Sequence, residues 1–300
     1  MSDRIGLTGI VAEACHGVLE HEKRAPQRFV ADIVLECDLR RAGADDELAS
    51  TVSYADIAQG AYAVLTGDSV DLIETLAERI AAVALAPVAV EAVEVTIRKP
   101  QAPAGVPFVD EVTGGPFVTV RREHDREVVI ALGANMGDRA GTMADAVRAL
   151  TAVDGLEVVA CSPLLETGAV GGPEQPDYLN AVVVARSRLA PWTLLDELHR
   201  IERNHGRVRE VRWGARTLDL DLIQVGDSTD DSDLRFETEE LTLPHPRAHE
   251  RAFVLVPWSR VDGTAQLRTA AGSEDIRELI DGLPAAALDG IRPGPAWDPL

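Results

Sequence analysis

A short alternation of leucine and aspartate, residues 218–222, constrains the fold more than any other part of this chain. Side chains of a β-strand alternate between its two faces, so the pattern predicts a leucine face turned to a core and both carboxylates, Asp219 and Asp221, on the other face. At about 3.3 Å of rise per residue, the two carboxylates stand about 6.6 Å apart. Such a pair can hold two Mg²⁺ ions for phosphoryl transfer, although a solvated strand face gives the same pattern.

Positive charge gathers just before this strand. Residues 199–216 contain six arginines and two glutamates, whereas the whole chain has a formal net charge of −21. A basic segment beside two carboxylates favours a nucleotide and metal site. The second half of the chain has no lysine and therefore no lysine-containing phosphate loop, so arginine, histidine and metal would hold the nucleotide. RNA binding by the same arginines is the alternative, opposed by the overall acidity and by the lack of interleaved aromatic residues.

The composition predicts a two-domain protein with small-molecule partners. Three hundred residues with 46% hydrophobic content are enough for two cores. The net charge disfavours general binding to nucleic acid or to anionic membranes. The three cysteines are scattered, which predicts neither a disulfide framework nor a zinc site. Because we find no apolar run of 18 residues and no apolar signal core, we expect a cytoplasmic protein.

Lysine is rare enough to be informative. Only Lys23 and Lys99 occur, against 27 arginines. Since only an amine readily loses its proton, a retained lysine can mark a site where proton transfer is needed, although chance gives the same count. Lys23 lies among charged residues and is expected at the surface. Lys99 ends an alternating strand before Pro100 and is the better candidate for chemistry.

Residues 1–122 predict an α+β domain. The periodicities indicate strands at 4–12, 28–39, 90–98 and 117–121, and helices at Tyr54–Leu65 and Asp71–Leu85. The order ββααββ predicts an antiparallel sheet with helices on one face. The sheet is small and its edges are open, so oligomerisation is expected to close it.

A charged linker at 123–127 separates this domain from a second one at 128–300. The second pattern indicates strands at 128–133, 156–166, 179–188 and 218–225, with helices ending near Leu150 and spanning 191–204. The order βαββαβ predicts a ferredoxin-like core. Residues 226–240 are acidic and are expected to form a mobile insertion. The tail from Pro284 is rich in proline, glycine and alanine and carries little signal.

Several side chains of the second domain are candidate ligands for substrate. Arginines suit phosphate because the guanidinium fork binds two oxygens. His245 stands between two prolines, where a simple turn residue is the alternative. Asn180 offers a paired donor and acceptor for an amide-like heterocycle, or satisfies backbone groups at a strand entry. The candidates for the nucleotide are Arg207, Arg216, His245 and Arg251.

Residues 129–258 resemble 6-hydroxymethyl-7,8-dihydropterin pyrophosphokinase of the folate pathway. The motifs that carry the resemblance are Ala131-Leu132-Gly133-Ala134-Asn135, Gln175-Pro176-Asp177-Tyr178-Leu179-Asn180, Gly206-Arg207-Val208-Arg209, Arg212-Trp213-Gly214, Arg216-Thr217-Leu218-Asp219-Leu220-Asp221 and Leu243-Pro244-His245. The resemblance implies transfer of pyrophosphate from ATP to the pterin hydroxymethyl oxygen, with release of AMP.

The resemblance also implies a role for each matching residue. Asp219 and Asp221 would hold two Mg²⁺ ions, and Arg207 and Arg216 would clamp the phosphates in catalysis. The other residues near the nucleotide would be His245, Arg251, Glu202 and Thr242. The pterin would be held by Asn180, Thr167, Tyr178, Phe253 and Trp213.

Residues 3–121 resemble dihydroneopterin aldolase. The matching pieces are His16-Gly17-Val18 with Glu22, Thr51-Val52-Ser53-Tyr54, residues 72–80, and Arg98-Lys99-Pro100-Gln101-Ala102-Pro103. The resemblance implies retro-aldol cleavage of 7,8-dihydroneopterin without cofactor or metal, because the pterin supplies the imine. It also implies a tunnelling-type fold that assembles into an oligomeric barrel, as a tetramer or octamer.

Within this resemblance, catalysis would fall to Lys99, Glu22 and Tyr54, with Tyr54 reaching a neighbouring subunit. Glu74 would anchor the pterin through two N–H bonds, with Ile73 and Val52 beside it. The first product is the second substrate, so a bifunctional enzyme is coherent. Two alternatives remain for the first domain: a pterin epimerase or oxygenase, and an inactive oligomerisation scaffold for the kinase.

Overall fold

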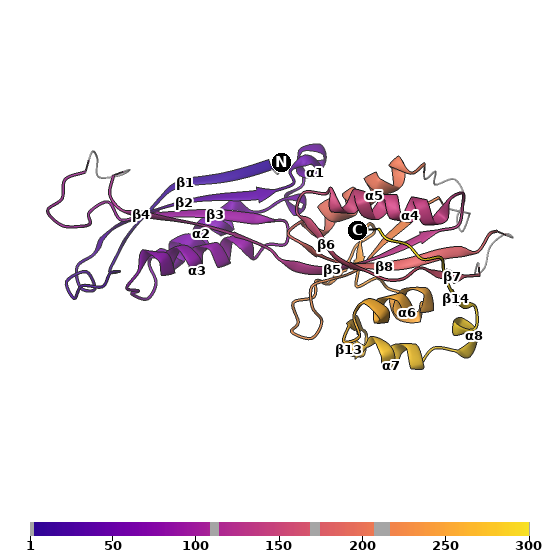
Figure 1. Cartoon of the computed structure of the whole chain (residues 1–300). Coiled ribbons are helices and arrows are strands. Elements are labelled where there is room, and N and C mark those ends of the chain that lie inside the picture. The colour runs from indigo at the N-terminus through magenta and orange to yellow at the C-terminus, as the bar shows by residue number, and fades with distance from the viewer. Residues whose placement is uncertain (1–2, 109–113, 169–174, 207–216, 300) are drawn as a thin grey trace. The chain divides into compact units, whose positions relative to one another are not determined.

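The computed structural model describes residues 3–108, 114–168, 175–206 and 217–299, and it divides the chain into two compact units, Met1–His124 and Asp125–Leu300 (Figure 1). The division lies within the expected linker. Strands continue to Glu123 and resume at Arg126, so only two residues separate the units' strands instead of the expected five. No helix among the described residues is long and apolar enough to cross a membrane.

The first unit is one antiparallel sheet with helices packed against one face. Its sheet has the order β1-β2-β3-β4. The strands are β1 (Asp3–Ala14), β2 (Gln27–Cys37), β3 (Ala92–Arg98) and β4 (Phe117–Glu123). The helices are α1 (Arg40–Asp45), the 3₁₀ turn η1 (Leu48–Ser50), α2 (Tyr54–Leu65) and α3 (Ile73–Leu85). The expected order of two strands, two helices and two strands is therefore observed, with α1 and η1 added.

Alternation decides which face of this sheet is buried. On β2, Phe29, Ala31, Ile33 and Leu35 point into the core that α2 and α3 cover. Helix α3 contributes Leu76, Ala77, Ile80 and Ala84, which lie on one helical face. Helix α2 begins at Tyr54 because Ser53 caps it, accepting a hydrogen bond from the Asp56 amide.

The outer parts of the first unit expose apolar surface. Among the described residues, β1 and β4 each pair on one side only. Large apolar side chains are exposed over this unit, at Val11, Val18, Leu19, Leu48, Tyr54, Tyr62, Leu72, Val106, Phe108 and Phe117. Open strand edges and exposed apolar side chains are features of chains that pair with further copies.

The second unit has a larger antiparallel sheet in the order β14-β7-β8-β5-β9, and β6 pairs with β8 beside β7. Its strands are β5 (Arg126–Ala134), β6 (Leu156–Cys161), β7 (Leu165–Thr167), β8 (Tyr178–Ser187), β9 (Asp219–Val225) and β14 (Ile291–Pro293). Two small hairpins add β10 (Phe236–Glu237) with β11 (Thr242–Leu243), and β12 (Gln266–Thr269) with β13 (Gly272–Asp275). The helices are α4 (Arg139–Thr151), α5 (Pro191–Asn204), η2 (Ala248–Glu250), α6 (Ala252–Val261), α7 (Ile276–Asp281) and α8 (Ala285–Leu288).

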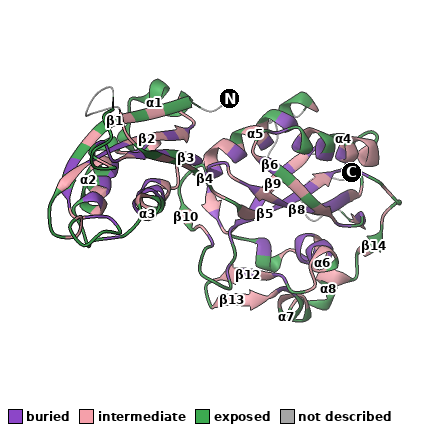
Figure 2. Ribbon diagram, turned by 60° about the vertical axis from the view of Figure 1, so that its left-hand side comes forward, coloured by how far each residue is buried: buried purple, intermediate pink, exposed green. Residues whose placement is uncertain are grey.

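This sheet is covered on both faces. Helices α4 and α5 lie over one face, and α6 lies over the other (Figures 1 and 2). The α4/α5 core includes Leu218, Leu220 and Leu222, as the alternation of β9 predicts. The core under α6 includes Ile223 and Trp258. Asp219 and Asp221 therefore emerge on the α6 face, where that core gives way to polar residues.

The prediction of one strand over 156–166 is wrong. The segment forms β6 and then β7, both paired with β8. Between them, the Ser162 amide donates to the Val182 carbonyl, and the Ser162 hydroxyl accepts from the Val182 amide, both at 2.9 Å. Pro163 follows and has no N–H to continue a ladder, so the strand is interrupted there.

The expected mobile insertion and uninformative tail are also corrected. Within 226–240, Asp233 is buried and its carboxylate accepts from the Arg268 guanidinium at 2.8 Å. An ion pair that fixes a loop onto β12 explains why acidic composition alone misled the prediction. The tail forms β14, which pairs with β7, and Trp297 Nε1 donates to the Ser162 carbonyl at 2.9 Å.

Candidate active sites

The first unit brings Lys99 and Glu22 together from distant parts of the chain. Lys99 Nζ donates to Glu22 Oε1 at 2.5 Å and to the His16 carbonyl at 3.3 Å. The two side chains are only 10% and 13% exposed. The ammonium also lies 5.7 Å from the centre of the Phe29 ring. The retained lysine is thus a nearly buried amine with a carboxylate partner, as a proton-transfer site requires.

A buried histidine holds the loop that carries Glu22. His16 Nδ1 lies 3.2 Å from the Val70 amide, which can only donate. His16 Nε2 therefore carries the proton and donates to the Leu65 carbonyl at 2.8 Å. The His16 ring also packs edge-on against Phe29. These contacts attach the segment after β1 to the connection between α2 and α3.

Gly17 is required beside this histidine. Its φ of +146° lies in a region that favours glycine, and a Cβ there would collide with the Glu22 carboxylate. The Gly17 amide donates to the Val70 carbonyl at 2.8 Å. The His16-Gly17 pair noted in the sequence therefore shapes the space that Glu22 occupies.

The Glu22 carboxyl is held ionised. Its hydrogen bond with Lys99, and then the Leu19 amide at 2.9 Å, keep its pKa below the ordinary value. A carboxylate that is ionised near neutrality can accept a proton and can orient the ammonium beside it.

The remaining predicted residues of the first unit stand at two helix starts. Glu74 is exposed in the first turn of α3, next to the half-buried Ile73. Tyr54 is 61% exposed at the start of α2, and Val52 is buried just before it. Within the described residues, none of these four bonds to Lys99 or Glu22. The structure therefore does not bring them into one hydrogen-bonded cluster with that pair.

In the second unit, register places three candidate positions in a row across neighbouring strands. Gly133 of β5 is the Cα partner of Asn180 on β8 and of Asp219 on β9. Directly paired residues of antiparallel strands share a face, so Asn180 and Asp219 flank Gly133 on the α6 face. A Cβ at Gly133 would stand 3.6 Å from Asn180 Oδ1 and 3.9 Å from Asp219 Cβ. Glycine leaves this surface open between the pterin and metal candidates.

Asn180 and Thr167 form a polar pair beside this row. Asn180 is buried, and its Nδ2 donates to Thr167 Oγ1 at 2.8 Å. Thr167 is the Cα partner of Tyr178, whose hydroxyl lies 3.3 Å from Gln175 Oε1. Three of the residues expected at the pterin thus lie on adjoining strands. Phe253, near the start of α6, has the Arg251 guanidinium 5.6 Å from its ring centre.

Arg251 also connects the aspartates with His245. Its Nη1 lies 3.3 Å from Asp221 Oδ2 and 3.4 Å from His245 Nε2. Burial lowers the pKa of His245, and Arg251 adds to that shift while Asp221 opposes it. The predicted metal carboxylate and two predicted nucleotide residues are therefore in direct contact.

A cavity of about 330 Å³ adjoins this group. Its lining includes Asp221, Glu202, Thr242 and His245, four residues predicted for the nucleotide and metal. Glu202 is buried, and its Oε1 accepts a hydrogen bond from the Leu220 amide at 2.8 Å. Its carboxylate thus also holds β9 in place. Three further predicted residues, Arg207, Arg216 and Trp213, lie outside the described residues.

Asp219 and Asp221 fit a magnesium site. They are half-exposed oxygen donors on one strand face, and the described residues contain no group of three or more metal-ligating side chains. Mg²⁺ commonly takes one or two carboxylates and completes its shell with water and substrate phosphates. A two-carboxylate donor set beside a polar cavity suits that arrangement.

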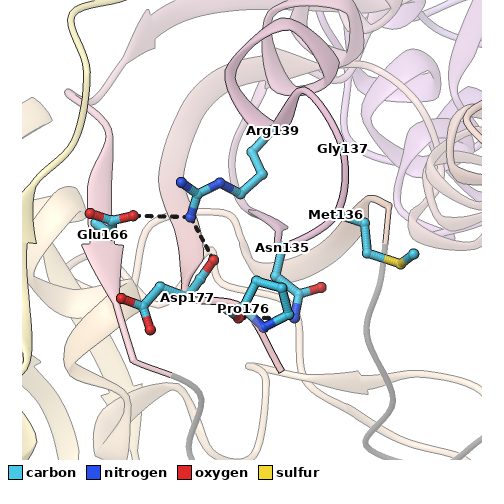
Figure 3. A pocket seen from close by; sticks show the side chains of 7 residues that line it. All are labelled: Asn135, Met136, Gly137, Arg139, Glu166, Pro176 and Asp177. Carbon is cyan, nitrogen blue, oxygen red and sulfur yellow. Dashed lines mark hydrogen bonds and ion pairs between the residues drawn. The ribbon is translucent and has the colours of Figure 1, made fainter. Parts of the chain in front are cut away.

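Sequence reasoning did not assign Arg139, Glu166 or Asp177 to a site. These residues line a second cavity, of about 570 Å³, with Asn135, Met136, Gly137 and Pro176 (Figure 3). Asn135 is buried, and its Nδ2 donates to Gln175 Oε1 at 3.1 Å and to the Pro176 carbonyl at 3.3 Å. The motif from Gln175 to Asn180 was the available signal, since it contains two of these contacts.

Comparison with known proteins identifies both units. Residues 5–113 match the family described as dihydroneopterin aldolase, and residues 129–263 match 7,8-dihydro-6-hydroxymethylpterin-pyrophosphokinase. The aldolase of Streptomyces coelicolor is 51% identical over 111 residues, which cover 37% of this chain and 92% of that protein. The pyrophosphokinase of Mycobacterium leprae is 42% identical over 170 residues, covering 55% and 87%. That of Bacillus subtilis is 41% identical, covering 44% and 75%.

Both relationships span most of the relatives' own length, and each falls on one of the two compact units. These relationships establish that the chain belongs to both families and is a bifunctional dihydroneopterin aldolase and hydroxymethyldihydropterin pyrophosphokinase of folate biosynthesis.

Proposed function

We propose that Lys99 and Glu22 carry out the proton transfers of the aldolase reaction. Removal of a proton from the C2′ hydroxyl of dihydroneopterin lets the C1′–C2′ bond break and releases glycolaldehyde. The electron pair passes into the ring imine, and protonation at C1′ leaves the hydroxymethyl group. The buried ammonium, paired at 2.5 Å with an ionised carboxylate, supports this assignment. In this proposal, Lys99 moves the protons through a water molecule, and Glu22 orients the Lys99 ammonium.

Glu74 anchors the pterin in this proposal. Its carboxylate accepts two N–H bonds from the guanidine-like edge of the ring. Its free, exposed position at the start of α3 supports a ligand role, and Ile73 and Val52 provide apolar contact. Tyr54, exposed at the start of α2, reaches the site of a neighbouring copy.

The chain assembles through its first unit in this proposal, as a tetramer or octamer with a barrel of joined sheets. Open edges on β1 and β4 and the exposed apolar side chains of that unit support assembly. Light scattering of the full chain at micromolar concentration tests it, and the mass of a single chain would contradict it.

In the second unit, the pterin hydroxymethyl oxygen attacks the β-phosphorus of ATP. The bond from the β-phosphorus to the α–β bridging oxygen breaks, AMP leaves, and the hydroxyl proton is lost. Thr167, Tyr178 and Asn180 orient the pterin, and Phe253 stacks on it. Arg251, His245 and Thr242 contact the nucleotide, and Glu202 lines the same cavity. Arg207 and Arg216 would clamp the phosphates. Trp213 would cover the substrates. The cavity beside Asp221 supports the nucleotide position.

Asp219 and Asp221 would hold two Mg²⁺ ions in this site. When bound, the ions supply neutralisation of phosphate charge. The two aspartates give that site its negative charge, and Arg251 limits their repulsion at 3.3 Å from Asp221. A ferredoxin-like core is also inferred, supported by the order β6-β8-β5-β9 and the helices α4 and α5 on one face.

One assay tests the assignment of both activities. The full chain is incubated with 7,8-dihydroneopterin, and ATP with Mg²⁺ is then added. Glycolaldehyde should appear before ATP is added, and AMP should appear only after ATP is added. A scaffold role for the first unit would be favoured if dihydroneopterin gives no glycolaldehyde while added hydroxymethyldihydropterin and ATP still give AMP. A dihydroneopterin isomer or an oxidised pterin would instead favour an epimerase or oxygenase.

A further inference from the structure

Two acidic residues stand immediately behind the pterin candidates. Thr167 and Tyr178 are Cα partners and share one face of β7 and β8. Glu166, one residue earlier, pairs with Leu179, which belongs to the α4/α5 core on the opposite face. Asp177 directly precedes Tyr178. Glu166 and Asp177 are therefore each one peptide unit away from a pterin candidate.

Arg139 holds both of these residues with a single nitrogen. Arg139 is the first residue of α4, and its Nη1 donates to Glu166 Oε1 at 3.0 Å and to the Asp177 main-chain carbonyl at 2.6 Å. Figure 3 shows the guanidinium between these two acceptors. The bond to a carbonyl fixes the backbone path into Tyr178, which a contact between side chains alone would not do.

A second arginine supports the same pair from the C-terminal strand. Arg292 of β14 pairs with the Asp177 carboxylate and lies 3.8 Å from Glu166 Oε2. Strand β14 joins the sheet so that Arg292 is opposite Glu166. Residues from α4, β7, β14 and the segment just before β8 thus meet in one charged group.

This arrangement differs from an ordinary surface ion pair on the same helix. Arg148 and Asp145 of α4 are both more than half exposed and lie three residues apart, so they connect no separate elements. The Arg139 side chain is 29% exposed and connects α4 with β7 and with the residue that precedes β8. Exposed pairs contribute little to stability, whereas a contact that decides the placement of a binding residue affects ligand binding directly.

We propose that Arg139 is a positioning residue for the pterin side of the kinase site, with Arg292 as its support. The inference rests on the pterin-binding roles proposed above for Thr167, Tyr178 and Asn180. Without Arg139, the segment through Asp177 and Tyr178 samples arrangements that do not bind pterin. The apparent affinity for pterin then falls in proportion to the population of the binding-competent arrangement. The nucleotide candidates make none of these bonds and keep their function; they are Glu202 on α5, Thr242 on β11, and His245 and Arg251 in the segment before α6.

The test compares Arg139→Met, Arg139→Lys and Arg148→Met in the full chain. Arg139→Met should raise KM for hydroxymethyldihydropterin about tenfold while kcat, KM for ATP and the aldolase rate stay within about twofold. Arg139→Lys should restore most of the lost affinity for the pterin, because a single nitrogen, Arg139 Nη1, donates both hydrogen bonds and a lysine ammonium can do the same. Arg148→Met should behave as the parent. Arg292→Ala should give a smaller rise in the same KM.

Asn180→Ala separates failure of this inference from failure of the proposed site. If Asn180→Ala raises KM for the pterin and Arg139→Met does not, the positioning role is overturned. If Arg139→Met also lowers kcat and raises KM for ATP, and Arg139→Lys does not restore these values, the substitution disturbs the whole kinase domain and the positioning role is overturned. If Asn180→Ala leaves pterin KM unchanged, the proposed pterin site itself is wrong.

Discussion

Lys99 and Glu22 in the first unit are opposite charges that satisfy each other in a nearly closed environment, whereas Asp219 and Asp221 in the second are like charges on a half-exposed strand face. The first pair shows its hydrogen bond directly, at 2.5 Å. In the second pair, Arg251 Nη1 lies 3.3 Å from Asp221 Oδ2. The first pair is organised by the protein alone, and the second is suited to a ligand that brings positive charge.

The difference matters for how each site responds to substitution. Changing one member of a buried opposite-charge pair leaves the other without its partner, so folding and chemistry are both affected. Removing one of two half-exposed like charges relieves repulsion and leaves the fold intact, while the proposed affinity for metal ions would be lost. Substitutions should therefore separate function from stability at the aspartates and couple them at Lys99 and Glu22.

The largest expected effect is at the aspartates. Asp221→Asn and Asp219→Asn should each lower AMP formation by at least about 10²-fold, since the metal ions proposed to bind there would supply several kcal/mol of charge stabilisation. Glycolaldehyde release and the thermal midpoint should stay near those of the parent. Glu237→Gln, an exposed acid in β10, is the control. Near-normal ATP turnover in Asp221→Asn would show that the metal assignment is wrong.

Lys99→Arg should have the next largest effect. A guanidinium has a pKa far above that of an amine and stays protonated, so arginine keeps the charge but cannot transfer the proton. The aldolase rate should fall by at least roughly 10²-fold while dihydropterin still binds, because Glu74 remains. The kinase rate should be unchanged. Lys23→Arg is the matched control, since Lys23 pairs with Asp71 at the surface.

Aldolase rates for Lys99→Arg within a few-fold of the parent would mean that position 99 supplies only charge. The proton-transfer role would then have to move to another group.

A smaller effect is expected at Gly133, between Asn180 and Asp219. A Cβ there makes ordinary contacts of 3.6 and 3.9 Å, so Gly133→Ala should fold and keep kinase activity within a few-fold. The larger Gly133→Val should fill the open surface and raise KM for both kinase substrates. Steady-state kinetics of both variants checks this prediction. If the KM values of Gly133→Val equal those of the parent, the substrates do not lie over Gly133.

The smallest effect concerns acid stability of the first unit. The Lys99 hydrogen bond lowers the pKa of Glu22 from 4.5, so its stabilising contribution is present above that value and is lost as pH falls through the lower, folded value. Hydrogen exchange of residues 18–24 should be faster in Glu22→Gln than in the parent at about pH 7, and the two should converge towards about pH 3.

All four tryptophans lie in the second unit, at 192, 213, 258 and 297. Tryptophan fluorescence during urea unfolding should therefore be the same for Glu22→Gln and the parent. A difference between the two proteins that persists at low pH would contradict the stabilising role of the ionised Glu22.

Local periodicity by itself determined much of this protein. Alternation in residues 218–222 predicted that both aspartates face away from the leucines, and the structure confirms it because a strand has no other way to arrange them. Helical spacing likewise predicted α2 with its observed bounds, and it predicted α3, which begins at Ile73 instead of Asp71. Motif resemblance predicted both activities, since short sets of residues carry the chemistry.

Only the tertiary structure decided which distant residues meet. Lys99 and Glu22 are 77 residues apart, and Arg292 and Asp177 are 115 apart, and no local pattern relates them. The same holds for the break between β6 and β7 and for the acidic segment around Asp233, which Arg268 ties to β12. Such contacts depend on sheet order and register, which are set by long-range packing of whole faces and not by the propensity of any one segment.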